Sequence, residues 1–143
     1  EAFEPNDSFV LGHELKSGAY LIDDGGTSNP KGFEAALELL DELEYEEKVM
    51  ITAGMIDLGS ESASIHREMA KKARAKGVQV IHLGVDGRKE FEEVLGKKLL
   101  TDVSAVHAVL ARADKKTLIL VEGKLPPEAE VLVVTEYAQK RGV

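Results

Sequence analysis

The sequence predicts an α/β domain built on a mostly parallel sheet, with an antiparallel hairpin strand near one edge. Short apolar runs alternate with segments whose apolar residues recur at helical spacing. One late run, TLILVEG at 117–123, is apolar almost throughout, as expected of a strand that is covered on both faces of a sheet. Because a strand, a helix and a further strand usually form a parallel crossover unit, this order favours a parallel sheet between layers of helices.

The first half of the chain predicts a hairpin, a helix and a strand. Segments 9–15 and 19–23 flank a Lys-Ser-Gly turn signal and are typical of a β-hairpin. Asn29 is a favourable N-cap for the next helix, and Pro30 occupies its first position, where the missing N–H costs nothing. The apolar run at 48–54 is the next expected strand.

The second half of the chain continues the alternation of strands and helices. The further expected elements are a helix from about Ser62 to Gly77, a strand at 78–84, helices at 89–96 and 104–113, and the strand at 117–123. The tail at 126–142 is ambiguous, because Val131 to Val134 favour a strand while Pro126-Pro127 followed by acids favours a helix start. We expect a helix there.

Length, charge and composition restrict the class of protein. We expect residues 1–143 to form a single domain, because this length allows a core of normal size. The absence of cysteine excludes disulfides and thiolate metal sites and indicates a reducing, cytoplasmic setting. The formal net charge of −8 argues against a nucleic-acid partner. No apolar run reaches the ~20 residues of a membrane span, so we expect no membrane partner, and we expect a monomer.

Polar residues gather where the expected strands end, and parallel α/β sheets bind ligands beyond those carboxyl ends. The ends are Asp23-Asp24, Ala53-Gly54-Met55, Leu83-Gly84 and Glu122-Gly123-Lys124. The pair Asp23-Asp24 is the strongest signal, because adjacent carboxylates are costly to bury without a cation or donors. At a strand end the pair could hold Mg²⁺ or accept from ribose hydroxyls. Alternatively, one member could cap Gly26 or Thr27 in an Asx turn.

Several common sites do not fit the sequence. No G-x-G-x-x-G or Walker A segment occurs, so the chain has no phosphate cradle of its own. The histidines, His13, His66, His82 and His107, show no zinc-binding spacing. We expect His66 and His107 to lie at the boundaries of their helices' apolar stripes. We expect His82, in a strand next to the loop ends, to be able to touch a ligand.

A response-regulator receiver domain is an alternative of a different class. Asp23 and Asp24 would be its acid pair, and Lys124 would be its lysine near the final strand. The phosphoacceptor is the difficulty, because the strand at 48–54 ends without an aspartate and Asp57 comes several residues late.

Three segments resemble the C-terminal domain of the Mur ligases, and most closely the type that adds D-alanyl-D-alanine. IDDGGTSNP at 22–30 is similar to the family's Ile-Asp-Asp-x-Tyr-Asn-x-Asn-Pro and leads into a helix. AGMIDLGSESASIHRE at 53–68 is similar to its Gly-Asp-Met-Leu-Glu-Leu-Gly followed by Leu-His-Arg-Glu. VEGKL at 121–125 resembles its third segment, Val-Lys-Gly-Ser-Arg, more loosely.

The resemblance implies a Rossmann-like, three-layer domain that closes over a central ATPase domain, which is absent from this chain. It implies that the full-length enzyme uses ATP and Mg²⁺ to activate a carboxylate as an acyl phosphate, which an amine then attacks, in the synthesis of peptidoglycan precursors. The implied partners are the central domain, an amino acid or dipeptide, and a UDP-linked acceptor. The isolated domain is expected to be inactive.

The resemblance also assigns site residues. Asp24 falls on the family's nucleotide-contacting aspartate, and Thr27, Ser28 and Asn29 fall on positions that line the nucleotide or the incoming amino acid. The remaining expected binding residues are Asp23, Lys124, Met55 and Asp57. No catalytic residue and no metal ligand is expected.

Three positions depart from the family pattern. Gly26 stands where the family has an aromatic or basic residue, and Gly54 where it has an acid. Glu122 replaces a lysine, although Lys124 lies nearby. The chain could therefore be a divergent ligase domain or a relative that no longer catalyses.

Overall fold

The computed structural model describes residues 10–26 and 28–137, and their order of elements confirms the predicted α/β class. The strands are β1 (Val10–Glu14), β2 (Tyr20–Asp24), β3 (Glu47–Thr52), β4 (Gln79–His82) and β5 (Thr117–Glu122). The helices are α1 (Pro30–Glu42), α2 (Ser62–Ala75), α3 (Arg88–Leu95), α4 (Val103–Arg112) and α5 (Pro127–Thr135). Two short 3-10 turns are η1 (Gly59–Glu61) and η2 (Gly96–Lys98).

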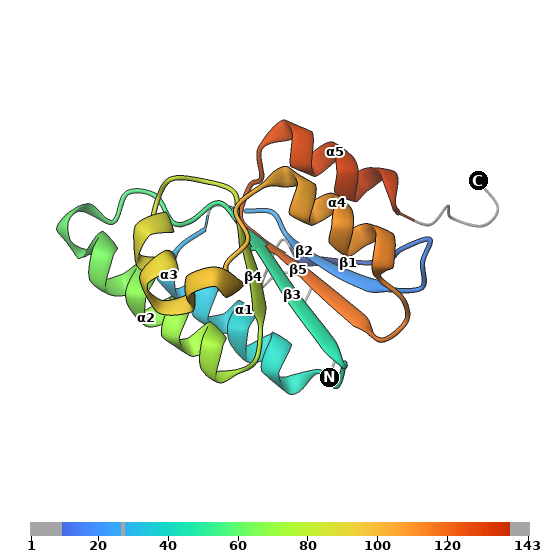
Figure 1. Ribbon diagram of the computed structural model, residues 1–143, viewed down its shortest axis with the longest axis horizontal. Coiled ribbons are helices and arrows are strands. Elements are labelled where there is room, and N and C mark those ends of the chain that lie inside the picture. Colours follow the sequence, from blue (N-terminus) through green and yellow to red (C-terminus); the bar gives the residue numbers. More distant parts are fainter. Residues whose placement is uncertain (1–9, 27, 138–143) are drawn as a thin grey trace.

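The sheet is mostly parallel, with strand order β1-β2-β5-β3-β4. β1 pairs with β2 in the predicted antiparallel hairpin, and the other neighbours pair in parallel. Helices α1, α2 and α3 lie on one side of the sheet, and α4 and α5 lie on the other (Figure 1). The chain therefore has the three layers that were expected.

The core on the α1–α3 side is built from the predicted apolar stripes. Phe33, Leu37 and Leu40 of α1 are fully buried, as is Phe91 of α3. The two phenylalanine rings lie 6.1 Å apart between centroids, in a tilted arrangement. Burying one such side chain contributes about 1.5–3 kcal/mol, so this layer fixes the helices against the sheet.

The tail helix α5 completes the other side. Ala129 and Val133 are buried against the sheet beside α4, whereas Val131 and Val134 remain 63% and 49% exposed. The predicted helix is confirmed: a strand would place Val131 on the same face as Ala129 and Val133, whereas Val131 is exposed. The strand propensity of the valines is overridden by this packing.

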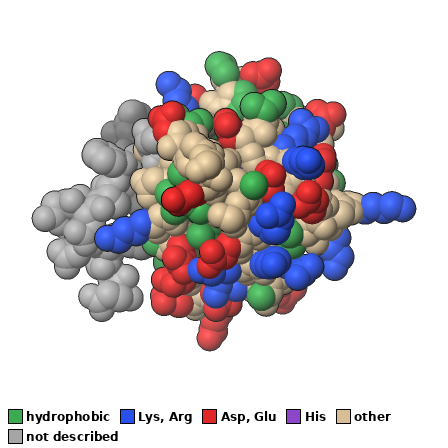
Figure 2. Space-filling model, turned by 90° about the vertical axis from the view of Figure 1, so that its left-hand side faces the viewer, with side chains coloured by type: hydrophobic (Ala, Val, Ile, Leu, Met, Phe, Trp, Pro, Cys, Tyr) green, Lys and Arg blue, Asp and Glu red, His purple; other side chains and the backbone are tan. Residues whose placement is uncertain are grey.

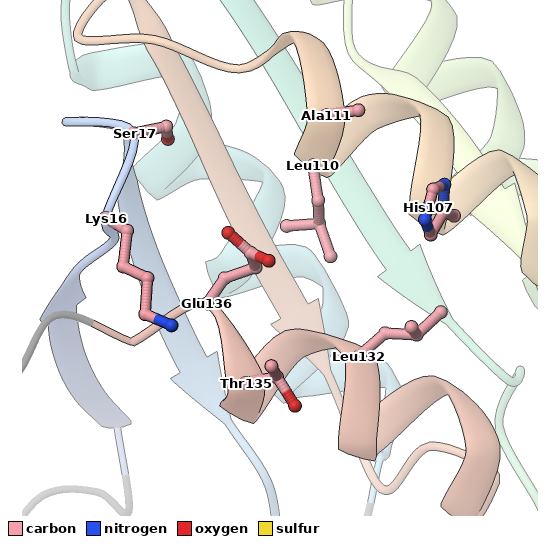
Figure 3. Close-up of a pocket in the computed structure, with 8 residues that line it drawn as sticks. All are labelled: Lys16, Ser17, His107, Leu110, Ala111, Leu132, Thr135 and Glu136. Atoms are coloured by element: carbon pink, nitrogen blue, oxygen red, sulfur yellow. The ribbon is translucent and has the colours of Figure 1, made fainter.

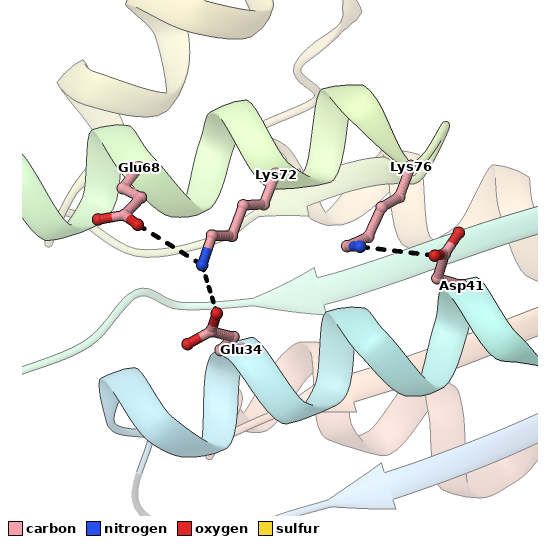
Figure 4. A network of polar contacts seen from close by, with 5 residues as sticks. All are labelled: Glu34, Asp41, Glu68, Lys72 and Lys76. Atoms are coloured by element: carbon pink, nitrogen blue, oxygen red, sulfur yellow. Dashed lines mark hydrogen bonds and ion pairs between the residues drawn. The ribbon is translucent and has the colours of Figure 1, made fainter.

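Charged side chains connect α1 to α2 across the surface of the first layer (Figure 4). Lys72 of α2 pairs with Glu34 of α1 and, at 3.5 Å, with Glu68 of its own helix. One turn later, Nζ of Lys76 lies 3.5 Å from Oδ2 of Asp41. Exposed pairs of this kind contribute little each, so the buried apolar layer stabilises the packing of these helices more than the pairs do.

The outer surface carries no large block of one charge on the face drawn in Figure 2, where acidic and basic side chains are interspersed. No helix among the described residues is long and apolar enough to cross a membrane.

Candidate functional site

The carboxyl ends of four neighbouring strands carry a row of polar residues. Asp24 of β2 is in register with Glu122 of β5, which is in register with Thr52 of β3. Thr52 is in register with His82 of β4. Residues in register on parallel strands point to the same face, so these side chains continue the α1–α3 face of the sheet.

The loops that leave this edge of the sheet lead to helices on opposite faces. The helices that follow β2 and β3, α1 and α2, lie on one face, whereas α5, which follows β5, lies on the other (Figure 1). Since β5 lies between β2 and β3, the loops separate at its carboxyl end. Open α/β sheets bind ligands at such a point, so the loops after β2 and β5 are the candidate site.

Glu122 is the central polar group of this edge. Its residue is 2% exposed, and Oγ of Ser28 donates to its Oε2 at 2.9 Å. Its other oxygen, Oε1, has no hydrogen-bond partner in the described part of the chain. Burial, together with the charge and the side-chain hydrogen bond of the nearby Asp24 carboxyl, raises the pKa of Glu122 to about 8, although the Ser28 hydrogen bond acts in the opposite direction. Glu122 is therefore protonated at neutral pH.

Local backbone geometry brings Ser28 to this carboxyl. Asn29 is the predicted N-cap, and its Oδ1 accepts from the backbone N of Gly32 at 2.8 Å. Across the loop, Gly123 has φ +81 and its N donates to the carbonyl of Asp24 at 2.8 Å. A Cβ on Gly123 would lie 2.9 Å from Cβ of Ser28, so this close approach of the two loops requires glycine.

Asp23 lies on the opposite side of the β2 end from Asp24 and contacts Tyr137. The hydroxyl of Tyr137 donates to Oδ2 of Asp23 at 3.4 Å, and its ring stacks on His13 with centroids 3.9 Å apart. Burial raises the pKa of Asp23, while the positive charge of His13 and the tyrosine hydrogen bond act against the rise. Burial, together with the Asp23 carboxylate, raises the pKa of Tyr137 to about 12.

A cavity of about 230 Å³ opens beside this second carboxyl. Its polar lining includes Asp23, Lys124, Glu130 and Tyr137. The paired acids of the sequence motif therefore serve two different faces of the same strand end.

The loop after β3 was expected to present Met55 and Asp57 to a substrate, and the structure differs at Met55. Met55 is 1% exposed and packs in the α1–α3 core, so its side chain does not face the loop surface as expected. Its backbone N donates to Nε2 of His66 at 3.0 Å, and Nδ1 of His66 donates to the carbonyl of Ser62 at 2.9 Å. Asp57 is exposed and has φ 62, a conformation that few non-glycine residues adopt.

The histidine expectations are wrong at two positions. His66 and His82 are both 0% exposed, so His66 is a core residue and not a boundary residue. His82 donates from Nε2 to the carbonyl of Asp86 at 2.8 Å, and burial lowers its pKa. Because both side chains are buried and hydrogen-bonded to backbone, they hold loops in place and do not reach a ligand. His107 is exposed on α4.

Gly54 shows why this loop carries no acid at its turn. Its φ is +91, and a Cβ there would lie 2.0 Å from the carbonyl oxygen of Asp86. The loops after β3 and β4 therefore pack backbone against backbone, which leaves no space for a side chain at Gly54.

A larger cavity lies at the other end of the sheet (Figure 3). It has a volume of about 540 Å³ and lies between the hairpin turn and the last turns of α4 and α5. Its lining residues include Lys16, His107, Leu110, Leu132 and Glu136. None of the expected binding residues that the structure describes lines it.

The structure thus brings only some of the predicted binding residues together. Asp24 and Ser28 meet at Glu122, and Asp23 and Lys124 line the neighbouring cavity. Thr27 lies outside the described residues. Among those described, no three His, Asp or Glu side chains gather closely enough to hold a metal ion. Glu122 was not among the predicted binding residues, although it lies at an expected strand end and stands where the family has a lysine.

Comparison with known proteins gives the family. A family model described as "Mur ligase, glutamate ligase domain" matches residues 10–125, which is most of the chain. The chain belongs to the Mur ligase family. No curated protein sequence gave a match.

Solved Mur ligases share the fold of this Mur ligase domain. MurF from Thermotoga maritima, in complex with ADP, has a TM-score of 0.67 and 21% identity over 94% of this chain and 31% of its own. MurF from Acinetobacter baumannii has a TM-score of 0.68 and 16% identity over 94% of this chain and 30% of its own. This chain therefore spans about a third of the length of these ligases.

A relative solved as a separate domain matches over nearly its whole length. It is a domain assigned to a UDP-N-acetylmuramate:L-alanyl-γ-D-glutamyl-diaminopimelate ligase from Haemophilus ducreyi, with a TM-score of 0.56 and 14% identity. The match covers 85% of this chain and 94% of that one. At these identities the structures show the fold alone.

Proposed function

We propose that this Mur ligase domain is the C-terminal, closing domain of an ATP-dependent amide ligase of peptidoglycan precursor synthesis. The observation that carries the proposal is the family match over residues 10–125, together with an acid-rich edge at the carboxyl ends of β2 and β5. The domain contributes positioning, because holding two reactants in the correct geometry can lower a barrier by several kcal/mol, about 7–11 at best.

The reaction proposed for the full-length enzyme joins a carboxylate to an amine. ATP phosphorylates the carboxylate of a UDP-linked acceptor, and the amine of an amino acid or dipeptide displaces phosphate from the acyl phosphate. The central ATPase domain and Mg²⁺ hold the phosphates, because the sequence of this chain contains no phosphate cradle.

The described residues fit the outer part of a nucleotide or substrate. Asp24 is half-buried and offers an acceptor for ribose hydroxyls, and Asn29 and Ser28 border the same loop. Lys124 is exposed beside the cavity at Asp23. We propose that these residues face the nucleotide or the incoming amine when the domain closes, in a cytoplasmic, monomeric enzyme.

The receiver alternative gains no support from this geometry. β3 ends at Thr52, which is in register with Glu122, and no aspartate stands at that strand end. A non-catalytic relative remains the competing class, and the assay below separates the two.

The test is an assay of the full-length parent protein. We expect ADP release that requires both a UDP-linked peptide acceptor and an amino acid or dipeptide. With ¹⁸O in the acceptor carboxylate, one labelled oxygen should appear in the released phosphate, because the acyl phosphate passes its bridging oxygen to phosphate. Absence of ADP release with every acceptor and amine pair would contradict the ligase function.

A further inference from the structure

Another cavity lies beside the start of β4, the last strand of the sheet. In the described part of the chain, only an isolated bridge from Leu100 to Ile81 continues the sheet beyond this strand. The cavity has a volume of about 300 Å³ and is bordered by Gln79 and Val80 of β4. Because β3 separates β4 from β5, the cavity lies apart from the candidate site at the ends of β2 and β5.

The charged residues that line this cavity are all cations. Arg74 comes from the last turn of α2, and Lys97 and Lys98 come from η2, which follows α3. No Asp or Glu is among the described residues of its lining, although the chain has 26 acidic and 18 basic side chains. The two cavities described above are each lined by acids as well as by a lysine. The charge of this lining therefore favours an anion.

The cations of the cavity are not neutralised by the described residues. Other basic side chains pair with acids, and these are Arg67, Lys72, Lys76, Arg88, Arg112 and Lys116. Within residues 10–26 and 28–137, Lys97 and Lys98 form no ion pair and no side-chain hydrogen bond. Nη1 of Arg74 donates to the carbonyl of Val94 at 3.2 Å, which leaves its other N–H groups available.

The ends of the helices explain only one of these three cations. A cation at a helix C-terminus is stabilised by the carbonyl groups there, and Arg74 makes such a contact with Val94 near the end of α3. Lys97 and Lys98 are both exposed, and neither donates to a helix carbonyl in the part of the chain that the structure describes. Their charges are therefore available to a ligand.

We propose that this cavity binds a small, soluble phosphate monoester that carries an apolar body. A phosphate monoester has nearly two negative charges at neutral pH, because its second pKa is about 6. The guanidinium of Arg74 can donate two parallel hydrogen bonds to phosphate oxygens, and the two lysines add point charges. Leu95 and Leu100, both half-buried, supply apolar walls for the body of the ligand.

The test titrates this chain with phenyl phosphate and follows backbone amides by NMR at about pH 7.5, where the probe is a dianion. We expect saturable shifts of the Gly77, Val78 and Leu100 amides, with an affinity that falls as salt is added. Inorganic phosphate has the charge without the apolar body and should bind about tenfold more weakly. Phenol has the body without the charge and should cause no saturable shift.

Two double variants separate the site from the overall charge of the protein. Lys97→Gln with Lys98→Gln should lower the affinity for phenyl phosphate about tenfold. Lys71→Gln with Lys89→Gln removes the same charge from exposed positions of α2 and α3 that do not line the cavity, and it should keep the wild-type affinity. Because all four lysines are exposed, both variants should keep the wild-type circular dichroism spectrum.

Several results would overturn the proposal. These are a lack of saturable shifts with phenyl phosphate, an equal loss of affinity in the two double variants, and equal affinity for phenyl phosphate and inorganic phosphate. Retention of the chain on phosphatidate vesicles without binding of phenyl phosphate would also overturn it, because the ligand would then be a membrane surface. The outcome is independent of the ligase function, since none of the residues proposed to face the reactants lines this cavity.

Discussion

Replacing Glu122 by glutamine should make the domain more stable at alkaline pH. The carboxamide has the shape of the protonated carboxyl, can accept from Ser28 and can donate toward Asp24, yet it cannot ionise. The variant therefore mimics the form of Glu122 that the folded state prefers. We expect the two proteins to be similar in stability at about pH 5 and to diverge as the pH rises.

The sign and size follow from the burial of Glu122. Its pKa rises from 4.5 to about 8 on folding, so between these values the folded state binds a proton that the unfolded chain does not. Stability is then full below the unfolded value and is lost as pH rises toward the folded value. The difference corresponds to about 5 kcal/mol, and water entering the loops reduces it, so we expect a loss of about 2–5 kcal/mol.

The assay is urea unfolding of both proteins from about pH 5 to about pH 9, with stability taken from the midpoint and slope. His82 is buried in both proteins, so its titration cancels in the difference. Glu38→Gln, at an exposed position of α1, is the matched control and should follow the wild-type profile. Parallel profiles for wild type and Glu122→Gln, or a variant less stable at about pH 9, would mean that Glu122 does not take up a proton on folding.

Further substitutions test the loops and the core. Gly54→Ala should lower the free energy of unfolding by about 3 kcal/mol or more, because its Cβ would meet the Asp86 carbonyl. Gly59→Ala, which has open space at φ +59, should lower it by about 1 kcal/mol. Thermal unfolding compares the two variants, and equal losses of stability would contradict the clash at Gly54. His66→Phe should lose about 2–3 kcal/mol and speed exchange of the Met55 amide, because that N–H loses its acceptor. The exposed His107→Phe is its control, and an unchanged Met55 amide in His66→Phe would count against the role of the ring.

The elements were predictable because their signals are local. Asn29 and Pro30 mark the start of α1 within two adjacent residues, and the structure confirms the cap by its hydrogen bond to Gly32. The helix at α5 was harder, because the valines at 131–134 favour a strand. Pro126-Pro127 followed by acids predicted the helix, and the packing of Ala129 and Val133 against the sheet and α4 confirms it.

The site was only partly predictable because it depends on register between distant segments. Asp24 and Glu122 become neighbours only when β5 is inserted between β2 and β3, and no local pattern specifies that strand order. The burial of His66 and His82 depends in the same way on how α3 covers the loops. Met55 was placed at a loop surface by its position in the motif, whereas its apolar side chain is buried in the core.

We propose that the edge formed by Asp24 and Glu122 is the surface of this Mur ligase domain that faces the reactants. The most direct test is the rate of amide formation by the full-length parent carrying Asp24→Asn, beside the Glu38→Gln control. Loss of a polar contact made to reactants should lower kcat/KM on the order of 100-fold with folding unchanged by circular dichroism, while the control keeps wild-type activity. Wild-type kcat/KM in a folded Asp24→Asn enzyme would mean that this edge does not contact the reactants.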